Sequence, residues 1–425
     1  MNIFDQLLAD NQIPKFVRVR HEMDHSHIDD IEGAVAQAMR REGTLDRIKP
    51  GDSVCITAGS RDVANIARVI RAICDQVKSV GAHPFIIPAM GSHAGAKAEG
   101  QRGIIEGYGV TEEAMGAPTR ASMDTEVIAH SKSGLEIHLD KFANAADFLI
   151  PVGRIKAHTD FRGEVESGIC KMLVIGMGKQ HGAYQCHKLG FKSMAANVKE
   201  FAGAIIEKKP NMFAIGLIEN AYHQTCRIEA IPAGRILEEE PPLLEYAKSR
   251  MAKVPFDQAD ILFVDETGKD ISGAGMDPNV TGRSPVLGIS RPFFQRIAVF
   301  DLTDKSHGNF GGLGSADVTT QRLYRKIDFE QTYPNGITAA EPLAVRLPAV
   351  MPSDRTAMQF ALRTATDCDW EKGPRIVWLK NTLSLSEFYI SEALIPDAEA
   401  LDNVTIVSEP MEVIFDEEGN VKELR

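Results

Sequence analysis

Three histidines stand in sequence contexts where an imidazole can do chemistry. His93 lies in AMGSHAGA, directly after an apolar run, and His158 lies in GRIKAHTDFRGE after another. His187 follows the glycine-containing segment KMLVIGMGKQHG. Histidine exchanges protons near neutral pH and also binds metals of intermediate softness. These side chains are therefore candidates for proton transfer or metal binding, and the alternative for each is an ordinary surface or core residue.

The segment KMLVIGMGKQHG places Gly176, Gly178 and Gly182 after an apolar run. The spacing G-x-G-x-x-x-G is one residue too long for the dinucleotide-binding fingerprint, so a nicotinamide site is disfavoured. A glycine turn whose backbone approaches a single phosphate, helped by Lys179, fits the segment better. The alternative is an ordinary tight turn.

Charged side chains gather near the same segments. The basic ones are Arg61, Arg154, Lys156, Arg162 and Lys171. Together they suit a small carboxylate or phosphate ligand, because arginine binds a carboxylate through two parallel hydrogen bonds. Glu164 and Glu166 either orient a histidine or lysine or face water, and the sequence slightly favours water.

The elements that would position these residues alternate between strand and helix. Buried strands are predicted within 53–59, 83–92, 146–155 and 213–220, and helices within 61–80, 97–107 and 237–251. This rhythm predicts an α/β fold with open, mostly parallel sheets. Ligands in such sheets bind outside the carboxyl ends of the strands. His93, His158 and the TAGSR turn that contains Arg61 all follow predicted strands.

A second α/β region begins with a strand in 254–268 and continues with strands near 296–302, 346–351 and 375–379. We therefore expect two domains, 1–255 and 256–400, with an active-site cleft between them. The last segment, 400–425, contains a strand-turn pattern, VIFDEEGNVKEL, that could pack against either domain, and we assign it to the first.

Composition narrows the functional class. The net charge of −12 argues against nucleic acid or an anionic membrane as a partner. The chain shows no signal-peptide pattern and no apolar stretch of about 20 residues, and its six cysteines include no CxxC pair. We expect a cytoplasmic protein with reduced thiols.

The order and spacing of these motifs resemble the nickel-dependent lactate racemase family. The GSH sequence around His93 resembles the family's glycine-small-histidine motif after a strand. His158, Lys171, Gly176 and His187 resemble its central histidine, lysine, glycine and second histidine, with Lys171 and His187 16 residues apart. The resemblance covers most of 50–220.

The resemblance implies a nickel-pincer nucleotide, a pyridinium-3,5-bisthiocarboxylic acid mononucleotide that holds nickel. It implies that Lys171 tethers this cofactor and that His187 binds the nickel. We also assign Gly176, Gly178 and Lys179 to cofactor binding. His93 and His158 would be the acid and base, and Arg61 and Lys269 would bind substrate. His181 is a rival nickel ligand, disfavoured by its spacing.

The activity implied is racemisation or epimerisation at C2 of a 2-hydroxy acid, by proton-coupled hydride transfer to and from the cofactor. Cofactor-synthesis enzymes would be partners. The turn Ala58-Gly59-Ser60-Arg61 lacks the family's acidic residue, and the loop between His158 and Lys171 is longer, which favours a larger substrate such as an aldonate. The alternatives are a divalent-metal hydrolase or lyase on the same scaffold, and a non-catalytic sensor of sugar acids or nucleotides.

Overall fold

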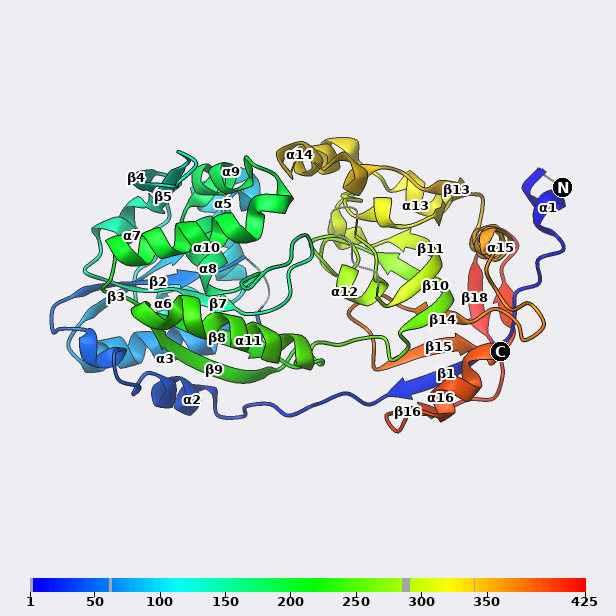
Figure 1. Ribbon diagram of the computed structural model, residues 1–425, viewed down its shortest axis with the longest axis horizontal. Coiled ribbons are helices and arrows are strands. Elements are labelled where there is room, and N and C mark those ends of the chain that lie inside the picture. Colours follow the sequence, from blue (N-terminus) through cyan, green and yellow to red (C-terminus); the bar gives the residue numbers. More distant parts are fainter. Residues whose placement is uncertain (1–2, 61–62, 285–290, 340) are drawn as a thin grey trace. The chain divides into compact units, whose positions relative to one another are not determined.

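The computed structural model describes residues 3–60, 63–284, 291–339 and 341–425. The chain divides into two compact units (Figure 1). We call Asp24–Met251 the central unit, and Met1–Met23 together with Ala252–Arg425 the terminal unit. The sequence analysis instead placed the first residues, and the segment after residue 400, with the central region. The terminal unit contains both segments because strands from each end of the chain pair in its sheet.

The central unit contains two three-stranded sheets and a hairpin. The parallel sheet has the order β3 (His83–Pro88), β2 (Ser53–Ala58) and β6 (Phe148–Ile150). The second sheet has the order β7 (Val152–Arg154), β8 (Phe213–Glu219) and β9 (Thr225–Pro232), with β7 parallel to β8 and β9 antiparallel. The hairpin joins β4 (Thr125–His130) to β5 (Glu136–Asp140). The predicted strands of this region are therefore present.

Helices cover both faces of the parallel sheet. Along β2, Val54 and Ile56 enter one apolar core while Cys55 enters the other, as the alternation of a strand requires. On the first face lies α3 (Ile66–Ser79), whose buried residues recur at helical spacing, and on the second lies α10 (Phe191–Lys208) (Figure 1). The remaining helices are α2 (Ile31–Ala38), α4 (His93–Ala96), α5 (Ala98–Gly107), α6 (Glu112–Met115), α7 (Lys141–Ala145), α8 (Ile169–Lys171), α9 (Lys179–His187) and α11 (Ile236–Arg250).

The terminal unit is built on one eight-stranded sheet. Its order is β13 (Ala349–Met351), β12 (Val318–Thr320), β11 (Phe293–Leu302), β10 (Gln258–Thr267), β14 (Ile376–Leu379), β15 (Glu387–Ser391), β1 (Phe16–His21) and β16 (Val404–Ile406). The strands from β13 to β14 are parallel, and β15, β1 and β16 pair in antiparallel fashion. A separate hairpin, β17 (Val413–Phe415) and β18 (Val421–Leu424), forms from the predicted strand-turn.

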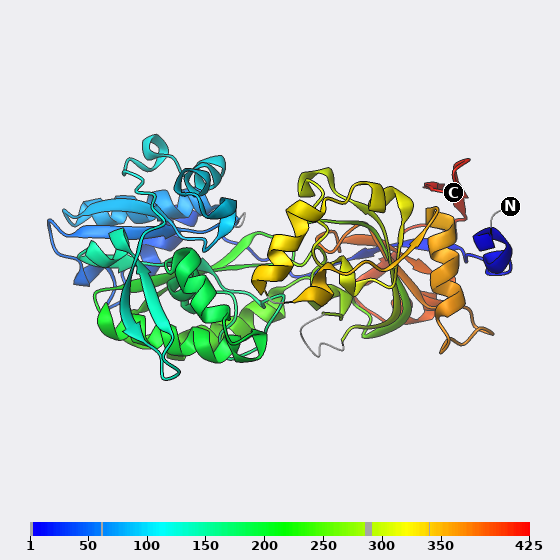
Figure 2. The ribbon, with the colours of Figure 1, turned by 90° about the horizontal axis from the view of Figure 1, so that it is seen from above.

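Apolar residues of β10 alternate between two cores, so this sheet is also buried on both faces. Figure 2 shows α15 (Asp354–Thr364) lying along the sheet, and its residues share a core with alternate residues of β10 and β11. The other helices are α1 (Ile3–Leu8), α12 (Pro278–Thr281), α13 (Gln321–Arg325), α14 (Phe329–Ala339) and α16 (Ile395–Glu399). The predicted α/β class with mostly parallel sheets is thus confirmed.

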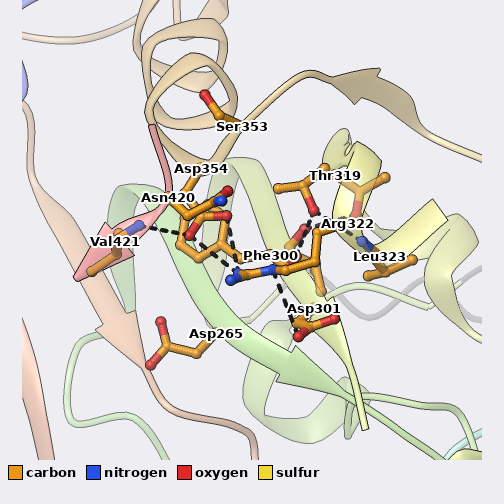
Figure 3. A network of polar contacts seen from close by, with 12 residues as sticks. Asp265, Phe300, Asp301, Thr319, Arg322, Leu323, Ser353, Asp354, Asn420 and Val421 are labelled. Atoms are coloured by element: carbon orange, nitrogen blue, oxygen red, sulfur yellow. Dashed lines mark hydrogen bonds and ion pairs between the residues drawn. The ribbon is translucent and has the colours of Figure 1, made fainter. Parts of the chain in front are cut away.

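A polar network lies at the carboxyl ends of the parallel strands in the terminal unit (Figure 3). Nη2 of Arg322, on α13, lies 3.1 Å from both carboxylate oxygens of Asp354, and Nε lies 3.6 Å from Asp301. The backbone N–H of Val421 donates to Asp354 at 2.9 Å and so attaches the C-terminal hairpin to the start of α15. In the described part of the chain, no helix is long and apolar enough to cross a membrane.

Candidate active site

A helical run from residue 169 to residue 187 carries two of the predicted site residues. It consists of α8, a π-helical turn over Met172–Gly176, and α9. Lys171 ends α8 and His187 ends α9. A π-helical turn inside an α-helix is rare and occurs most often at functional sites. The run therefore combines an unusual backbone with a lysine and a histidine.

His158 and Lys171 are in direct contact. Nε2 of the histidine lies 2.6 Å from Nζ of the lysine. The backbone N–H of Asp160 donates to Nδ1 of His158 at 2.9 Å, which assigns the proton of the neutral ring to Nε2. The contact is then a hydrogen bond when Nζ accepts as an uncharged amine. Burial, followed by the positive charge of Lys171, holds the pKa of His158 well below its usual value.

His187 has a defined tautomer as well. Its Nδ1 lies 2.6 Å from the carbonyl oxygen of Ala183, and because a carbonyl only accepts, Nδ1 carries the proton. The lone pair is left on Nε2, which is the arrangement of a histidine that binds a metal. Burial lowers the pKa of His187, and the bond to Ala183 opposes this shift. The neutral, metal-binding form is therefore favoured at neutral pH.

A buried carboxylate holds the backbone at His158. Glu166 is fully buried, and its Oε2 accepts the backbone N–H of His158 at 2.7 Å. Lys248 of α11 lies 3.0 Å from Oε1 of the same carboxylate. Glu164, in contrast, is exposed and pairs with Lys199. The expectation that both glutamates face water is correct for Glu164 and wrong for Glu166.

The loops after β2 and β3 lie against the same helical run. A Cβ on Gly59, after β2, would lie 3.3 Å from Cε of Met172, beside Lys171. A Cβ on Gly91, after β3, would lie 3.2 Å from Ile175 and 3.7 Å from Cβ of Ala183. Both loops therefore approach the run at the carboxyl ends of their strands, as expected for a ligand site in a parallel sheet.

His93 lies on the second of these loops and is exposed. After it, Ala94 has φ 54° and Ala96 has φ 55°, in the left-handed region that alanine rarely adopts. The buried amide of Gln101 donates to the carbonyl oxygens of Gly91 at 2.8 Å and of His93 at 3.3 Å. The backbone beside His93 is thus strained and held in place, a combination that concentrates at functional sites.

The predicted glycine turn is part of the helical run. A Cβ on Gly176 would lie 3.0 Å from the carbonyl oxygen of Ala89, so this glycine lets the helix approach the end of β3. Gly178 is likewise buried, in the turn that precedes α9. Lys179 is fully buried, donates to the carbonyl of Pro88 and lies 3.3 Å from Asp140. These positions do not fit the predicted phosphate contact, because all three residues are committed to internal packing.

Three further candidates are Arg61, Lys269 and His181. Arg61 lies outside the described residues. Lys269 is in the terminal unit, where its Nζ donates to the carbonyl of Gly273 at 2.6 Å. The ring of His181 stacks on that of His138 in β5, with centroids 5.6 Å apart. His181 thus packs on the β4–β5 hairpin. His187 instead lies near the other candidates, because, besides burial, the charge of Lys171 lowers the pKa of His187 and the charge of His187 lowers the pKa of His158.

Two of the predicted basic ligand residues are paired within the protein. Arg154 lies 2.6 Å from Glu219 in a largely buried ion pair. Arg162 donates to the backbone carbonyl of His158 and lies 3.4 Å from Glu166. These arginines support the loop around His158.

Sequence reasoning missed Glu240 and Gln101, which hold backbone groups next to predicted site residues. Glu240 belongs to the run EEEPP, which has the composition of a solvated surface. The only local signal in the sequence is a glycine at each contact. Gly168 lies against the carboxylate of Glu240, and the backbone of Gly91 accepts a hydrogen bond from Gln101.

Comparisons with known proteins bear on the sequence and on the fold. Residues 4–198 match the model of the lactate racemase N-terminal domain. The structure of the lactate racemase apoprotein from Thermoanaerobacterium thermosaccharolyticum aligns with a TM-score of 0.53 and 16% identity, over 86% of this chain and 93% of that chain. A protein from Thermotoga maritima aligns with a TM-score of 0.44 and 11% identity, over 83% and 87% of the two chains. No curated protein matches the sequence.

The family match contains His93, His158, Lys171 and His187, and the solved racemase shares the fold. Residues 4–198 are therefore similar to the lactate racemase N-terminal domain, and the chain has the fold of the solved lactate racemase.

Proposed function

We propose that this protein is a racemase or epimerase that inverts C2 of a 2-hydroxy acid with a nickel-pincer nucleotide. The observation that carries the proposal is the local cluster of His158, Lys171 and His187. Nζ of Lys171 meets the ring of His158 at 2.6 Å, and the bond from His187 to Ala183 leaves Nε2 of His187 as a ligand. The family supports the general activity, and this chemistry supports the cofactor.

The residues of the cluster fit the proposed cofactor. Lys171 would tether it, because an uncharged amine is the form that joins a thiocarboxyl group. His187 would bind the nickel through Nε2. When bound, the nucleotide supplies a group that accepts a hydride from C2 and returns it. Gly176, Gly178 and Lys179 would support the helix that holds these two residues.

His158 would exchange the proton of the substrate hydroxyl. In this structure Nδ1 accepts the backbone N–H of Asp160 and the ring proton lies on Nε2, so Nε2 would accept the proton of the substrate only after the ring proton has moved to Nδ1. The lowered pKa keeps the ring neutral near pH 7, as a general base requires. The ring of Phe161 lies 4.2 Å from that of His158 and limits the access of water on that side.

His93 would act on the opposite face of the substrate. Inversion needs one proton-exchanging group on each side of C2, and His93 lies on a separate loop that packs against the same helical run. Arg61 and Lys269 would bind the carboxylate of the substrate. The polar loop between His158 and Lys171 favours a sugar acid such as an aldonate.

The first test is the mass and metal content of protein produced together with cofactor-synthesis enzymes. We expect stoichiometric nickel and an added mass on the peptide that contains Lys171. Lys171→Arg should lack the added mass, and Lys188→Arg, at an exposed position close to the end of α9, should retain it. Protein without nickel or added mass, despite proven cofactor supply, would favour a metal-dependent hydrolase or lyase instead.

The second test follows the reaction in deuterated water over a panel of 2-hydroxy acids and aldonates. Inverted product should gain little deuterium at C2, because the hydride is retained and returned. Complete exchange at C2 would indicate abstraction of a proton and exclude the proposed mechanism. His93→Ala and His158→Ala should each lose inversion while keeping the nickel. A sensor would instead bind its ligand without turnover in all variants.

A further inference from the structure

Glu240 is a buried carboxylate on α11 that the proposed reaction does not use. Its neighbours in the run EEEPP face outward: Glu238 is exposed, and Glu239 lies 2.6 Å from Arg41. Glu240 is fully buried and points to the start of α8. Among the described residues, no cation pairs with this carboxylate in the structure. The hydrogen-bond donor to this carboxylate is instead a backbone N–H group, which satisfies part of its need for partners.

The donors to Glu240 come from the first turn of the helical run. Oε2 accepts the backbone N–H of Cys170 at 2.9 Å, and the carboxylate also accepts from the backbone of Ile169 and the thiol of Cys170. A Cβ on Gly168 would overlap Oε1, so the absence of a side chain there lets the carboxylate reach the helix. Burial raises the pKa of Glu240, and these hydrogen bonds oppose the shift.

These contacts have a consequence for the next residue along the chain. The first N–H groups of a helix have no partner within it, and an acceptor that binds them fixes the first turn. A carboxylate also lies favourably at the positive end of the helix dipole. Ile169 and Cys170 are the first two residues of α8, and Lys171 is the third. Glu240 thus fixes the backbone from which Lys171 reaches His158.

We propose that Glu240 is a positioning residue for Lys171, which it places for cofactor attachment through its hydrogen bonds to Ile169 and Cys170. The inference deepens the proposed function, because the importance of Lys171 rests on its role as the tether. Glu240 touches neither substrate nor cofactor. Its effect passes through the backbone of α8.

The first test measures amide hydrogen exchange at residues 169–172 in the full chain without cofactor. Glu240→Met keeps the volume but removes the acceptor, and we expect exchange at least tenfold faster there. Glu240→Gln keeps an acceptor oxygen and should remain within threefold of wild type. Glu239→Gln is the matched control on the same helix and should change nothing at 169–172.

A measurement of global stability separates positioning from folding. Replacement of a buried charge by an apolar side chain of similar size often leaves stability unchanged. We therefore expect Glu240→Met to keep the urea midpoint of wild type while it loses local protection at 169–172. Unchanged local exchange in Glu240→Met would overturn the proposal, as would equal acceleration across the whole central unit.

A second variant displaces the carboxylate without altering α11. Gly168→Ala places a Cβ against Oε1 of Glu240, and it should reproduce the faster exchange of Glu240→Met. Gly103→Ala, where a Cβ would meet nothing within 4 Å, is the control. Normal exchange at 169–172 in Gly168→Ala would contradict the role of the carboxylate.

Cofactor loading provides the final readout. In co-expressed protein, the fraction of Lys171 peptide with added mass should fall at least fivefold in Glu240→Met and recover in Glu240→Gln. Wild-type loading in Glu240→Met would refute the positioning role. If wild-type protein itself carries no added mass, the proposed function fails, whereas the exchange experiment still decides whether Glu240 orders α8.

Discussion

The two units use buried carboxylates in different ways. In the terminal unit, the buried Asp354 and the partly exposed Asp301 face the guanidinium of Arg322, and Asp354 also accepts the backbone N–H of Val421 (Figure 3). In the central unit, Glu166 and Glu240 accept backbone N–H groups beside His158 and Lys171. The first arrangement joins strands, a helix and a hairpin. The second orders the backbone around groups that can react.

The central unit also contains the candidate site residues His93, His158, Lys171 and His187. Near His158 and Lys171, Glu166 and Glu240 bind backbone N–H groups, and Glu166 also pairs with Lys248. Nζ of Lys171 contacts the ring of His158 at 2.6 Å. Arg322, in contrast, is shared between two aspartates and has little capacity for a ligand. The carboxylates of the terminal unit therefore hold an arginine, whereas Glu166 and Glu240 hold the backbone beside candidate site residues.

The largest effect should follow removal of Glu166. Glu166→Ala leaves the N–H of His158 without its acceptor and Lys248 without its buried partner. We expect a loss of about 4 kcal/mol in the free energy of unfolding, measured by urea titration with circular dichroism. Glu164→Ala removes an exposed carboxylate and should not change the midpoint measurably. Equal effects of the two substitutions would show that Glu166 orders nothing.

In the terminal unit, Asp265 should give the next largest effect, with a defined pH dependence. Burial raises its pKa to about 7, although the indole N–H of Trp378 donates to it at 2.5 Å. The folded chain therefore keeps a proton that the unfolded chain releases near pH 4, so stability falls as the pH rises from about 4 to about 7. Asp265→Asn should lack this loss and exceed wild type by about 3 kcal/mol at pH 8.

Tryptophan fluorescence reports on this substitution selectively, because the only two tryptophans of the chain, Trp370 and Trp378, lie in the terminal unit. At pH 4 the variant and wild type should unfold at the same urea concentration. A difference that is constant from pH 4 to pH 8 would mean that Asp265 does not titrate during unfolding.

His158 should show the opposite pH dependence, with a smaller effect. Its lowered pKa means that the folded chain excludes a proton that the unfolded chain binds below about pH 6.5. Stability is therefore complete above this pH and falls below it. His158→Asn should remove up to about 2 kcal/mol of this loss between pH 7 and pH 5. Hydrogen exchange of central-unit peptides measures the difference, and identical acid sensitivity in both proteins would contradict the shift.

His181 should give the smallest effect. Its ring stacks on His138, so His181→Ala removes one ring contact, worth at most about 1 kcal/mol. The variant should retain the nickel content of wild type, whereas His187→Ala should lose nickel. Metal analysis of the two variants after co-expression decides between them. Loss of nickel in His181→Ala alone would reverse the assignment of the ligand.

The sequence predicts the strands well because each is a short apolar run bounded by polar or turn-forming residues. It also predicts that loops after successive strands meet, which the contacts of Gly59 and Gly91 with one helical run illustrate. It does not predict the π-helical turn at Met172–Gly176, because no local pattern distinguishes that turn from an α-helix. The glycines there suggested a phosphate loop, but they serve close packing of helix on strand.

The sequence also does not predict which carboxylates are buried. Glu166 and Glu240 lie in charged segments that resemble solvated surface, and only tertiary packing determines which charge of a run turns inward. The place of the first strand also depends on partners far away in sequence. Phe16 pairs with Ser391, a contact that periodicity near residue 16 does not encode.

That pairing has a consequence for synthesis. β1 lies between β15 and β16 in the sheet of the terminal unit. Along the sequence, all of Asp24–Met251 therefore stands between β1 and the other strands of that sheet. On the ribosome, β1 emerges before the central unit but must wait for Glu387–Ser391, on the order of tens of seconds at typical rates of translation. The central unit has all its strands by then. The order of folding is therefore central unit first, with β1 kept as an unpaired strand until Glu387–Ser391 has been synthesised.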